Sequence, residues 1–262
     1  WRGWACRTAR CRNRQNRYAL WLARPGHPPQ LVFLPLPKQV EAFIAVLSGL
    51  YRWILFGGAR AGGKSFFMRW LAYMLCLRIP NFRVVLLRRT YPELESSHMR
   101  RMGAEAKLLG GEYVPSARPP VMRFTNGSVL ELGHCQDPQD VERYLSAEYH
   151  LVLPDEVGTF EEDMILKIGA SARVYSEHFK PCIMASTNPG AKWVRERWID
   201  KAVDTERFPG YDPSEYFFIQ SKLDDNPYPD PEYEKFLNSL DPNTRAAWRD
   251  GSWDVFEGQY FR

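Results

Sequence analysis

The sequence predicts an α/β protein with a mainly parallel sheet flanked by helices and with a small C-terminal lid or linker subdomain. Short apolar segments of strand character alternate along the chain with segments of helical periodicity, an order typical of parallel sheets. A glycine-rich loop connects the first of these strands to a helix. A later strand, 151–153, is followed by the acidic pair Asp155-Glu156, so polar side chains gather where strands end, at the edge where such sheets bind ligands.

The expected elements follow one another at ordinary lengths. An Asn126-Gly127 dipeptide between apolar segments predicts a hairpin turn. The predicted helices are 40–50, the helix that follows the loop and runs through Leu77, 93–109 and the stretch around 165–175. The predicted strands are 53–56, 83–87, 151–153 and 182–185.

We divide the chain into three parts on composition. Residues 1–34 form a basic N-terminal arm, and residues 35–206 form the α/β core. From residue 207 the sequence is rich in Pro, Asp, Tyr and Trp and contains two short helices, the second capped by Asp241 and ended by Gly251. Residues 207–262 are therefore predicted to form the small subdomain.

The glycine-rich loop has the spacing G-x-x-x-x-G-K-[ST] of a phosphate-binding loop. Gly58, Gly62 and Gly63 allow backbone N–H groups to approach phosphate oxygens, and the following helix adds its positive end. Lys64 is expected to reach the β- and γ-phosphates of a nucleotide, and the Ser65 hydroxyl is expected to ligate Mg²⁺. The fold is therefore predicted to be a P-loop NTPase of the ASCE/RecA-like type.

The acidic pair supplies the second chemical element. Asp155 is expected to hold the Mg²⁺ shell, and Glu156 is expected to orient and activate the attacking water. A third element, the polar run Ser186-Thr187-Asn188 at the end of the next strand, can contact the γ-phosphate or the water. The alternative for this run is a simple turn favoured by Asn-Pro-Gly. The acidic pair Asp155-Glu156 favours hydrolysis over transfer of the phosphoryl group to a small substrate, because only hydrolysis needs a residue that activates water.

Composition limits the class of protein. No apolar run approaches the ~20 residues that span a bilayer, and the chain does not open on a signal-peptide pattern, so neither secretion nor membrane insertion is expected. Five scattered cysteines argue against a disulfide framework and for a reducing compartment. Only Cys6 and Cys11 are close in sequence, without the further ligands of a zinc site.

The net charge of +4 is unevenly distributed. The first 40 residues contain eight basic side chains and no acidic one, so the remainder carries −4. Arginines mixed with Trp1, Trp4, Tyr18 and Trp21 suit contacts to phosphates and stacking on bases. A solvated tail and a surface for a partner subunit are the open alternatives.

Several motifs in order resemble the ATPase domain of tailed-bacteriophage terminase large subunits, the motors that package DNA. The resemblance extends over about 35–261, and the phosphate loop is its most specific part. The other motifs that carry it are Gln39, Arg88-Arg89-Thr90, Asp155-Glu156, Thr187-Asn188-Pro189-Gly190 with Trp193, Asp225-Asn226-Pro227-Tyr228 and Gly251-Ser252-Trp253-Asp254-Val255.

The resemblance implies roles for further residues. Gln39 would recognise adenine, and Asn188 would couple hydrolysis to movement. An arginine finger from a neighbouring subunit would complete each site, with Arg143 the candidate in trans and Arg60 the alternative in cis. A surface ion pair is the alternative interpretation of Arg143.

The resemblance also implies cofactors and partners. The cofactors are ATP and Mg²⁺, and the partners are double-stranded DNA, a homo-oligomeric ring, of five subunits, on the portal of the procapsid, and the small terminase subunit. The location would be the host cytoplasm. No nuclease activity is expected, because the chain ends where an RNase H-like domain begins in the family. Three alternatives remain: a helicase-like remodelling ATPase, a nucleotide-binding switch without significant turnover, and a small-molecule kinase.

Overall fold

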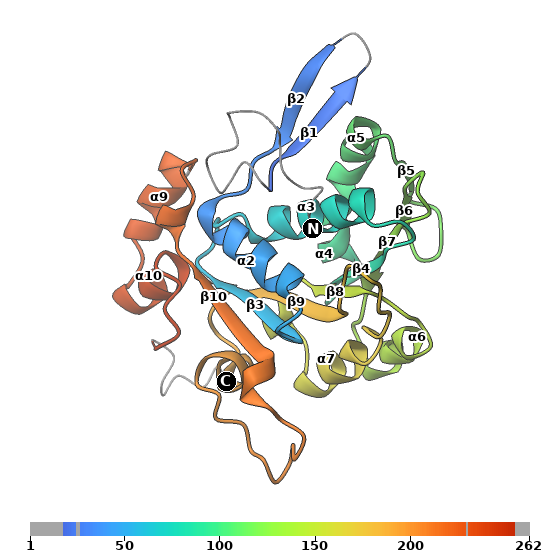
Figure 1. Cartoon of the computed structure of the whole chain (residues 1–262). Helices are drawn as coiled ribbons and strands as arrows, with labels where there is room; N and C mark the ends of the chain where they lie inside the picture. Colours follow the sequence, from blue (N-terminus) through green and yellow to red (C-terminus); the bar gives the residue numbers. More distant parts are fainter. Residues whose placement is uncertain (1–17, 25–26, 229, 255–262) are drawn as a thin grey trace.

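The computed structural model describes residues 18–24, 27–228 and 230–254. Within these residues the main sheet has eight strands in the order β10-β3-β9-β8-β4-β7-β6-β5 (Figure 1). The strands from β10 to β7 are parallel, and β6 and β5 are antiparallel. The strand bounds are β3 Trp53–Gly58, β4 Arg83–Arg88, β5 Glu112–Val114, β6 Val121–Arg123, β7 Val129–His134, β8 Leu151–Pro154, β9 Cys182–Thr187 and β10 Tyr216–Ser221. The predicted α/β fold with a mainly parallel sheet is confirmed.

Helices cover both faces of this sheet, because alternate residues of its buried strands point to opposite sides. In β3, Ile54 and Phe56 belong to one apolar core, and Trp53 and Leu55 belong to the other. Figure 1 shows α2, α3 and α5 on one side and α6 and α7 on the other. The helix bounds are α2 Pro37–Ser48, α3 Lys64–Arg78, α4 Tyr91–Leu94, α5 Arg100–Leu109, α6 Glu142–Leu145, α7 Glu162–Gly169, α8 Lys192–Val194, α9 Pro231–Asn238 and α10 Pro242–Trp248.

Two segments join these helices in an irregular way. A π-helical turn, Glu95–Met99, lies between α4 and α5, so the predicted helix 93–109 contains a local widening. A second π-helical turn, Arg195–Ile199, follows α8. None of the helices in the described part of the chain combines the length and apolar composition that crossing a bilayer requires.

The prediction of a helix around 165–175 is wrong at its C-terminal end. Helix α7 ends at Gly169, and Ala172 then pairs with Tyr149 in a parallel bridge. The N–H groups of Arg173 and Val174 both donate to the Tyr149 carbonyl. These residues are held by the chain entering β8, so they cannot continue the helix.

The segment predicted as a C-terminal subdomain contributes a strand to the core. Strand β10 (Tyr216–Ser221) lies at the edge of the main sheet, parallel to β3. The two predicted short helices, α9 and α10, follow it, and Asp241 caps α10 as expected. Residues 207–254 are therefore joined to the core through the sheet.

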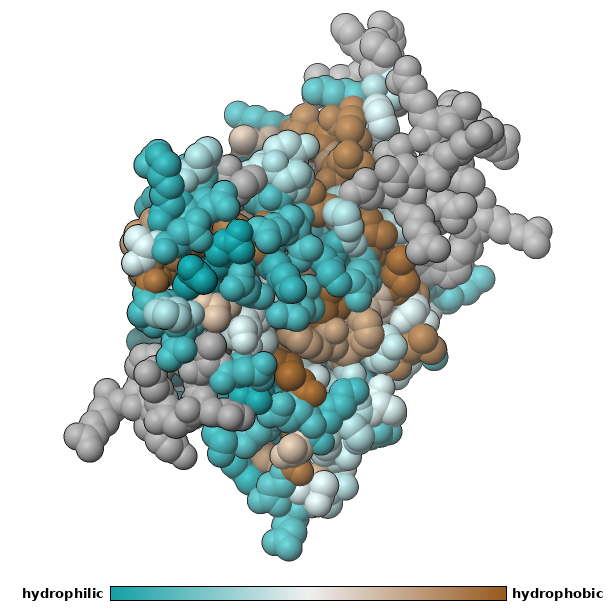
Figure 2. Space-filling view, turned by 90° about the vertical axis from the view of Figure 1, so that its left-hand side faces the viewer, coloured by the Kyte–Doolittle hydropathy of each residue, from teal (hydrophilic) through white to brown (hydrophobic). Residues whose placement is uncertain are grey.

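The described part of the N-terminal arm is a docked hairpin. Strands β1 (Leu20–Arg24) and β2 (His27–Phe33) pair antiparallel, and Phe33 stacks on Trp70 of α3 at 5.2 Å between ring centroids. Tyr18 stacks on Phe43 of α2, so it packs against the core rather than standing free for a base. Figure 2 shows apolar residues gathered in the upper part of a mostly hydrophilic face. The arginine-rich run and the Cys6/Cys11 pair lie outside the described residues.

Candidate active site

The phosphate loop connects β3 to α3 along a backbone path that few residue types adopt readily. The φ angles are 135° at Gly58, 58° at Ala61 and 72° at Gly63. Glycine adopts such angles without the strain that a Cβ atom causes, so the turn requires glycine at 58 and 63. Helix α3 begins at Lys64, and the unpaired N–H groups of its first turn form an anion-binding end at the loop.

The C-terminal part of the chain packs directly on this loop. The Ala59 N–H donates to the Ser221 carbonyl at 2.7 Å, and the Arg60 N–H donates to the Trp248 carbonyl at 2.8 Å. A Cβ atom at Gly251, whose φ is 66°, would lie 2.7 Å from the Ala59 nitrogen. The loop is therefore held from behind by backbone that leaves no room for a side chain at position 251.

Lys64 is buried at the loop, where neutral oxygens surround its ammonium group. The Nζ atom donates to the Gly58 carbonyl at 3.3 Å, the Ala59 carbonyl at 2.5 Å and Oδ1 of Asn188 at 2.9 Å. Burial lowers the pKa of Lys64 from 10.5 to about 8, and the carboxylates of the acidic pair oppose this shift. A phosphate would be a stronger, charge-assisted partner than these neutral oxygens.

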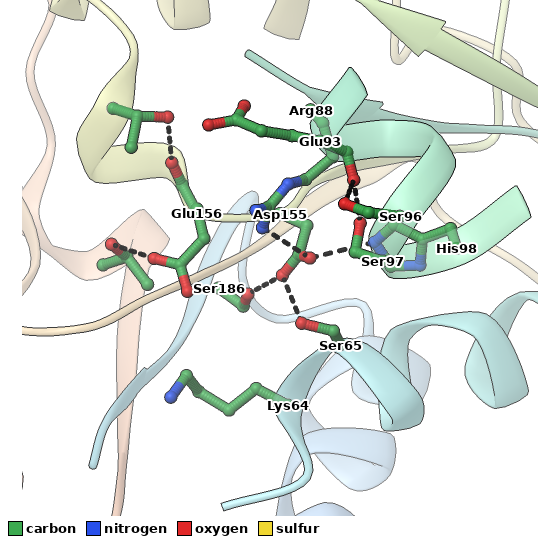
Figure 3. Close-up of polar contacts among 12 residues, drawn as sticks. Lys64, Ser65, Arg88, Glu93, Ser96, Ser97, His98, Asp155, Glu156 and Ser186 are labelled. Atoms are coloured by element: carbon green, nitrogen blue, oxygen red, sulfur yellow. Dashed lines mark hydrogen bonds and ion pairs between the residues drawn. The ribbon is translucent and has the colours of Figure 1, made fainter. Parts of the chain in front are cut away.

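Asp155 is fully buried immediately after β8, and both of its oxygens accept hydrogen bonds (Figure 3). Oδ1 accepts from the Ser65 hydroxyl at 3.2 Å and from the Ser186 hydroxyl. Oδ2 accepts from Nη1 of Arg88 at 3.0 Å and from Nε2 of His98 at 2.9 Å. Burial by itself raises the pKa of this carboxyl group, but these donors and the charge of Arg88 outweigh it and hold the pKa below its ordinary value. Asp155 is therefore ionised at neutral pH.

Glu156 turns its side chain toward the end of β9. Its backbone lies in the left-handed region with φ 56° and ψ 51°, a strained conformation for a residue other than glycine. Oε1 accepts from Nδ2 of Asn188 at 2.9 Å, and Oε2 accepts from the Thr187 hydroxyl at 3.4 Å. Burial, and next the charge of Asp155, raise the pKa of Glu156, while Lys64 opposes them. A carboxylate with a raised pKa is suited to accept a proton from water.

Asn188 joins the two halves of this network. Its amide oxygen accepts from Lys64, and its amide nitrogen donates to Glu156. The predicted phosphate-binding lysine and the predicted water activator are thus both hydrogen-bonded to one side chain. The structure brings together Lys64, Ser65, Asp155, Glu156 and Asn188.

Gln39 lies beside the phosphate loop in the first turn of α2 and is only 2% exposed. Its Oε1 accepts from the Leu36 N–H at 2.9 Å, and its Nε2 is 3.4 Å from the Gly63 carbonyl. Its role toward adenine stays a prediction.

The two arginines predicted as finger candidates lie outside this network. The Arg60 guanidinium carbon is 3.5 Å from the centroid of the Trp248 ring. Arg143, on α6, has a side chain that is 60% exposed and pairs with Asp140 at 2.5 Å. The surface ion pair considered as the alternative for Arg143 is therefore present, and a role toward a second subunit stays a prediction.

The oxygen donors at the loop fit a magnesium ion that is bound together with a nucleotide. Mg²⁺ binds to proteins through one or two carboxylates, with phosphates and water completing its shell. Ser65 supplies a hydroxyl oxygen, and Asp155 supplies a carboxylate oxygen beside it. The described residues contain no group of three or more His, Cys, Asp or Glu side chains that could hold a metal. With one hydroxyl and one carboxylate at the loop, the site suits an ion that arrives with phosphate.

Sequence reasoning gave no role at Asp155 to Arg88, Ser186 or His98. Arg88 ends β4 and Ser186 lies near the end of β9, and these strands flank β8. Convergence of the strand ends could have identified both residues. His98 had no comparable signal, because it is a single histidine within a helical pattern.

The chain is similar to known terminases. The family model described as phage terminase large subunit matches residues 52–251. Comparison with curated proteins gave no match.

Three solved structures illustrate the likeness. The large terminase of a thermophilic bacteriophage has a TM-score of 0.63 and 15% identity over 84% of this chain and 54% of its own. The same thermophilic-phage terminase in complex with ATP-γS has a TM-score of 0.60 and 14% identity over 84% and 53%. The large terminase ATPase domain of Thermus phage P74-26 has a TM-score of 0.58 and 15% identity over 84% and 94%. The chain thus spans about half the length of the thermophilic-phage terminase, and at these identities the likeness concerns the fold.

Proposed function

Because the chain belongs to the phage terminase large subunit family, we propose that it is the ATP-hydrolysing motor domain that drives double-stranded DNA into a procapsid. The placement of Lys64, Ser65, Asp155 and Glu156 around one phosphate loop is the observation that carries the proposal. The thermophilic-phage terminase has been solved with ADP and with ATP-γS, which supports ATP as the nucleotide.

In the proposed reaction the chain holds the phosphates and accepts one proton. The loop N–H groups and Lys64 bind the β- and γ-phosphates, and Ser65 and Asp155 would hold the magnesium ion, which neutralises phosphate charge when bound. Glu156 takes a proton from water as the water oxygen attacks the γ-phosphorus. The bond from phosphorus to the β–γ bridging oxygen breaks, and ADP leaves with that oxygen.

Asn188 gives this site a route to report the state of the phosphate. A γ-phosphate that binds Lys64 competes with the amide oxygen of Asn188, because an anion is the better partner for an ammonium group. Loss of that bond frees Asn188 to shift relative to Glu156. We therefore assign Asn188 to the coupling of hydrolysis to movement, with Gln39 as the adenine contact.

The proposed assembly is a homo-oligomeric ring on the portal of the procapsid, which also works with the small terminase subunit. In such a ring Arg143 would complete the site of the next subunit, since its exposed guanidinium is paired only with the neighbouring Asp140 among the described residues. An arginine supplied in trans stabilises the charge of the transition state.

Replacing Arg143 with alanine is expected to leave nucleotide affinity unchanged and to lower turnover by about 10³-fold in the assembled state. Mixing this variant with Glu156→Gln should restore part of the activity, because the second variant supplies the arginine. Arg173→Ala is the matched control, since Arg173 also forms an exposed ion pair, with Glu148. Absence of restored activity in the mixture would count against the trans role.

Exposed basic side chains on α5 and on the β5–β6 hairpin support DNA as the partner. Exposed basic side chains here form no ion pair with the described acidic residues. They are Arg100, Arg101, Lys107, Arg118 and Arg123. Unpaired arginines and lysines bind the phosphate backbone of DNA through release of counterions.

Replacing Arg100, Arg101 and Arg118 together with alanine is expected to lower affinity for double-stranded DNA by about tenfold or more and to reduce its salt dependence. Basal hydrolysis without DNA should stay unchanged. The matched control replaces Lys38 and Lys235, which are paired with Glu41 and Glu232. Equal DNA affinity in both variants would move the DNA contact elsewhere, including to the N-terminal arm.

Steady-state ATP hydrolysis across protein concentration, with and without double-stranded DNA, tests the function itself. Turnover per subunit that rises with concentration or DNA would support a ring-forming DNA motor. Tight nucleotide binding without turnover under all conditions would contradict the motor and favour a nucleotide-binding switch.

A further inference from the structure

The two oxygens of Asp155 have different hydrogen-bond partners. Oδ2 accepts hydrogen bonds from Arg88 and His98, both of which approach it with N–H groups. A cation cannot share that side of the carboxylate with two donors. Oδ1 faces the hydroxyls of Ser65 and Ser186 instead, and a hydroxyl that donates to Oδ1 keeps its lone pairs for another partner.

The partners of His98 determine which of its ring nitrogens carries the proton. Nη1 of Arg69 lies 3.4 Å from Nδ1, and a guanidinium can only donate, so Nδ1 is the acceptor. Nε2 therefore carries hydrogen and donates to Asp155.

Arg69 is itself held by a carboxylate and a carbonyl. Its Nε and Nη2 atoms donate to the two oxygens of Glu105 at 3.1 and 3.2 Å, and Nη1 also donates to the Ser97 carbonyl at 3.2 Å. The Tyr73 hydroxyl donates to Glu105 at 2.6 Å. The arginine is only 2% exposed, so this pairing is what makes its charge tolerable in the interior.

Helix α3 connects this buried chain to the phosphate loop. Ser65, Arg69 and Tyr73 follow one another at intervals of four residues and therefore share one face of the helix. Ser65 acts on Oδ1 of Asp155 directly, and Arg69 acts on Oδ2 through His98. Both oxygens of Asp155 are thus positioned from the helix that begins at the phosphate-binding lysine.

The backbone at His98 departs from regular α-helical geometry. His98 is fully buried and lies in the π-helical turn Glu95–Met99, between α4 and α5. A π-helical turn is rare and is frequently found at functional sites.

We propose that His98, held by Arg69 and Glu105, is a positioning residue that keeps Oδ2 of Asp155 occupied and presents Oδ1 beside Ser65 to the magnesium ion of the nucleotide. This inference rests on the proposed function, because it assumes that the loop binds a magnesium nucleotide. Partners that orient a metal ligand commonly account for about 10–100-fold in metal affinity.

The test measures the dissociation constant of fluorescent mant-ADP in EDTA and in saturating Mg²⁺, and the ratio of the two constants gives the contribution of the metal. His98→Leu should lower this ratio by about tenfold while leaving the constant in EDTA unchanged. His98→Gln places an amide N–H near the position of Nε2 and should restore most of the ratio. His98→Asn has the same amide on a shorter side chain and should not.

His150→Leu is the matched control. His150 is also buried, and it precedes β8, at the opposite end of the strand from Asp155. This variant should lose stability without changing the ratio. If His98→Leu does not fold, the comparison of the Gln and Asn variants still decides the question.

A wild-type ratio in His98→Leu, or equal ratios in the Gln and Asn variants, would overturn the inference and leave the proposed function intact. Metal-dependent mant-ADP binding by the wild type without ATP hydrolysis would count against the motor and leave the role of His98 standing. Nucleotide binding by the wild type that does not respond to Mg²⁺ would overturn both.

Discussion

Replacing Glu156 with glutamine is expected to lower kcat for ATP hydrolysis by about 10²–10⁴-fold, the range for loss of a general base. Glutamine keeps the length of the side chain, and its amide oxygen can still accept from Asn188. Nucleotide affinity should therefore stay within a few-fold of the wild type. Single-turnover hydrolysis and nucleotide binding measured on the same preparation check the two expectations.

The pH dependence provides a second readout of this residue. The pKa of Glu156 is raised by burial and by the charge of Asp155, and only the deprotonated carboxylate accepts a proton. Wild-type kcat should therefore rise with pH through a range above the ordinary carboxyl pKa, and this limb should be absent in the variant. Glu161→Gln, an exposed neighbour, is the control. A Glu156→Gln protein that still cycles would move the role of water activator to another group.

Replacing Lys64 with methionine is expected to remove measurable turnover and weaken nucleotide binding, because the ammonium is the one lysine charge at the phosphate loop among the described residues. The loss should be at least about 10²–10³-fold in kcat, the range for removal of one donor that stabilises developing charge. Lys167→Met, on the surface of α7, is the control. Near-normal hydrolysis by the variant would exclude Lys64 from the site.

The same substitution, Lys64→Met, should raise the stability of the folded protein although it removes turnover. The folded protein lowers the pKa of Lys64 to about 8 from 10.5, so below pH 8 the charged lysine is buried at a cost. At about 1.4 kcal/mol per pKa unit, this cost is roughly 3 kcal/mol. The variant avoids the cost, but it also loses the three hydrogen bonds of the ammonium group, which offsets part of its gain in stability. We expect Lys64→Met to raise the free energy of unfolding at pH 7 by about 1–2 kcal/mol.

The advantage of the variant has a defined pH window. As pH rises from 8 to 10.5, Lys64 loses its proton in the folded wild type before it does so in the unfolded chain. The free energy of unfolding of the wild type therefore rises over this range, and the advantage of the variant becomes smaller. Chemical denaturation of both proteins at pH 7 and pH 10 measures this. A difference that does not shrink with pH would mean that the charge of Lys64 is not what burial penalises.

Local sequence signals were sufficient for the parts of the site that lie at strand ends. The phosphate loop and the acidic pair follow buried apolar strands, and a parallel sheet brings such ends to one edge, so the loop and Asp155 meet as expected. The spacing of the motifs along the chain could not predict the left-handed backbone of Glu156. Nor could it predict the two hydrogen bonds that join Asn188 to Lys64 and to Glu156. These depend on how two neighbouring strands end in space.

Other features depend on contacts between residues that are distant along the chain. Strand β10 lies in a segment whose composition is typical of turns, and only its pairing with β3 makes it part of the sheet. Arg69 and Glu105 are 36 positions apart, so no periodicity relates them. His98 reaches Asp155 through a π-helical turn, a geometry that helical periodicity does not predict.

The packing of the C-terminal segment on the phosphate loop sets a lower limit on the size of a working fragment. A protein shortened to remove α9, α10 and the residues after them would lose the carbonyl that accepts from Arg60 and the close backbone contact of Gly251. Its loop would keep every residue of the phosphate-binding motif but lose backbone that shapes it from behind. The smallest unit of this chain that keeps the phosphate loop in its observed shape therefore extends through Gly251, far beyond the motif that defines the loop.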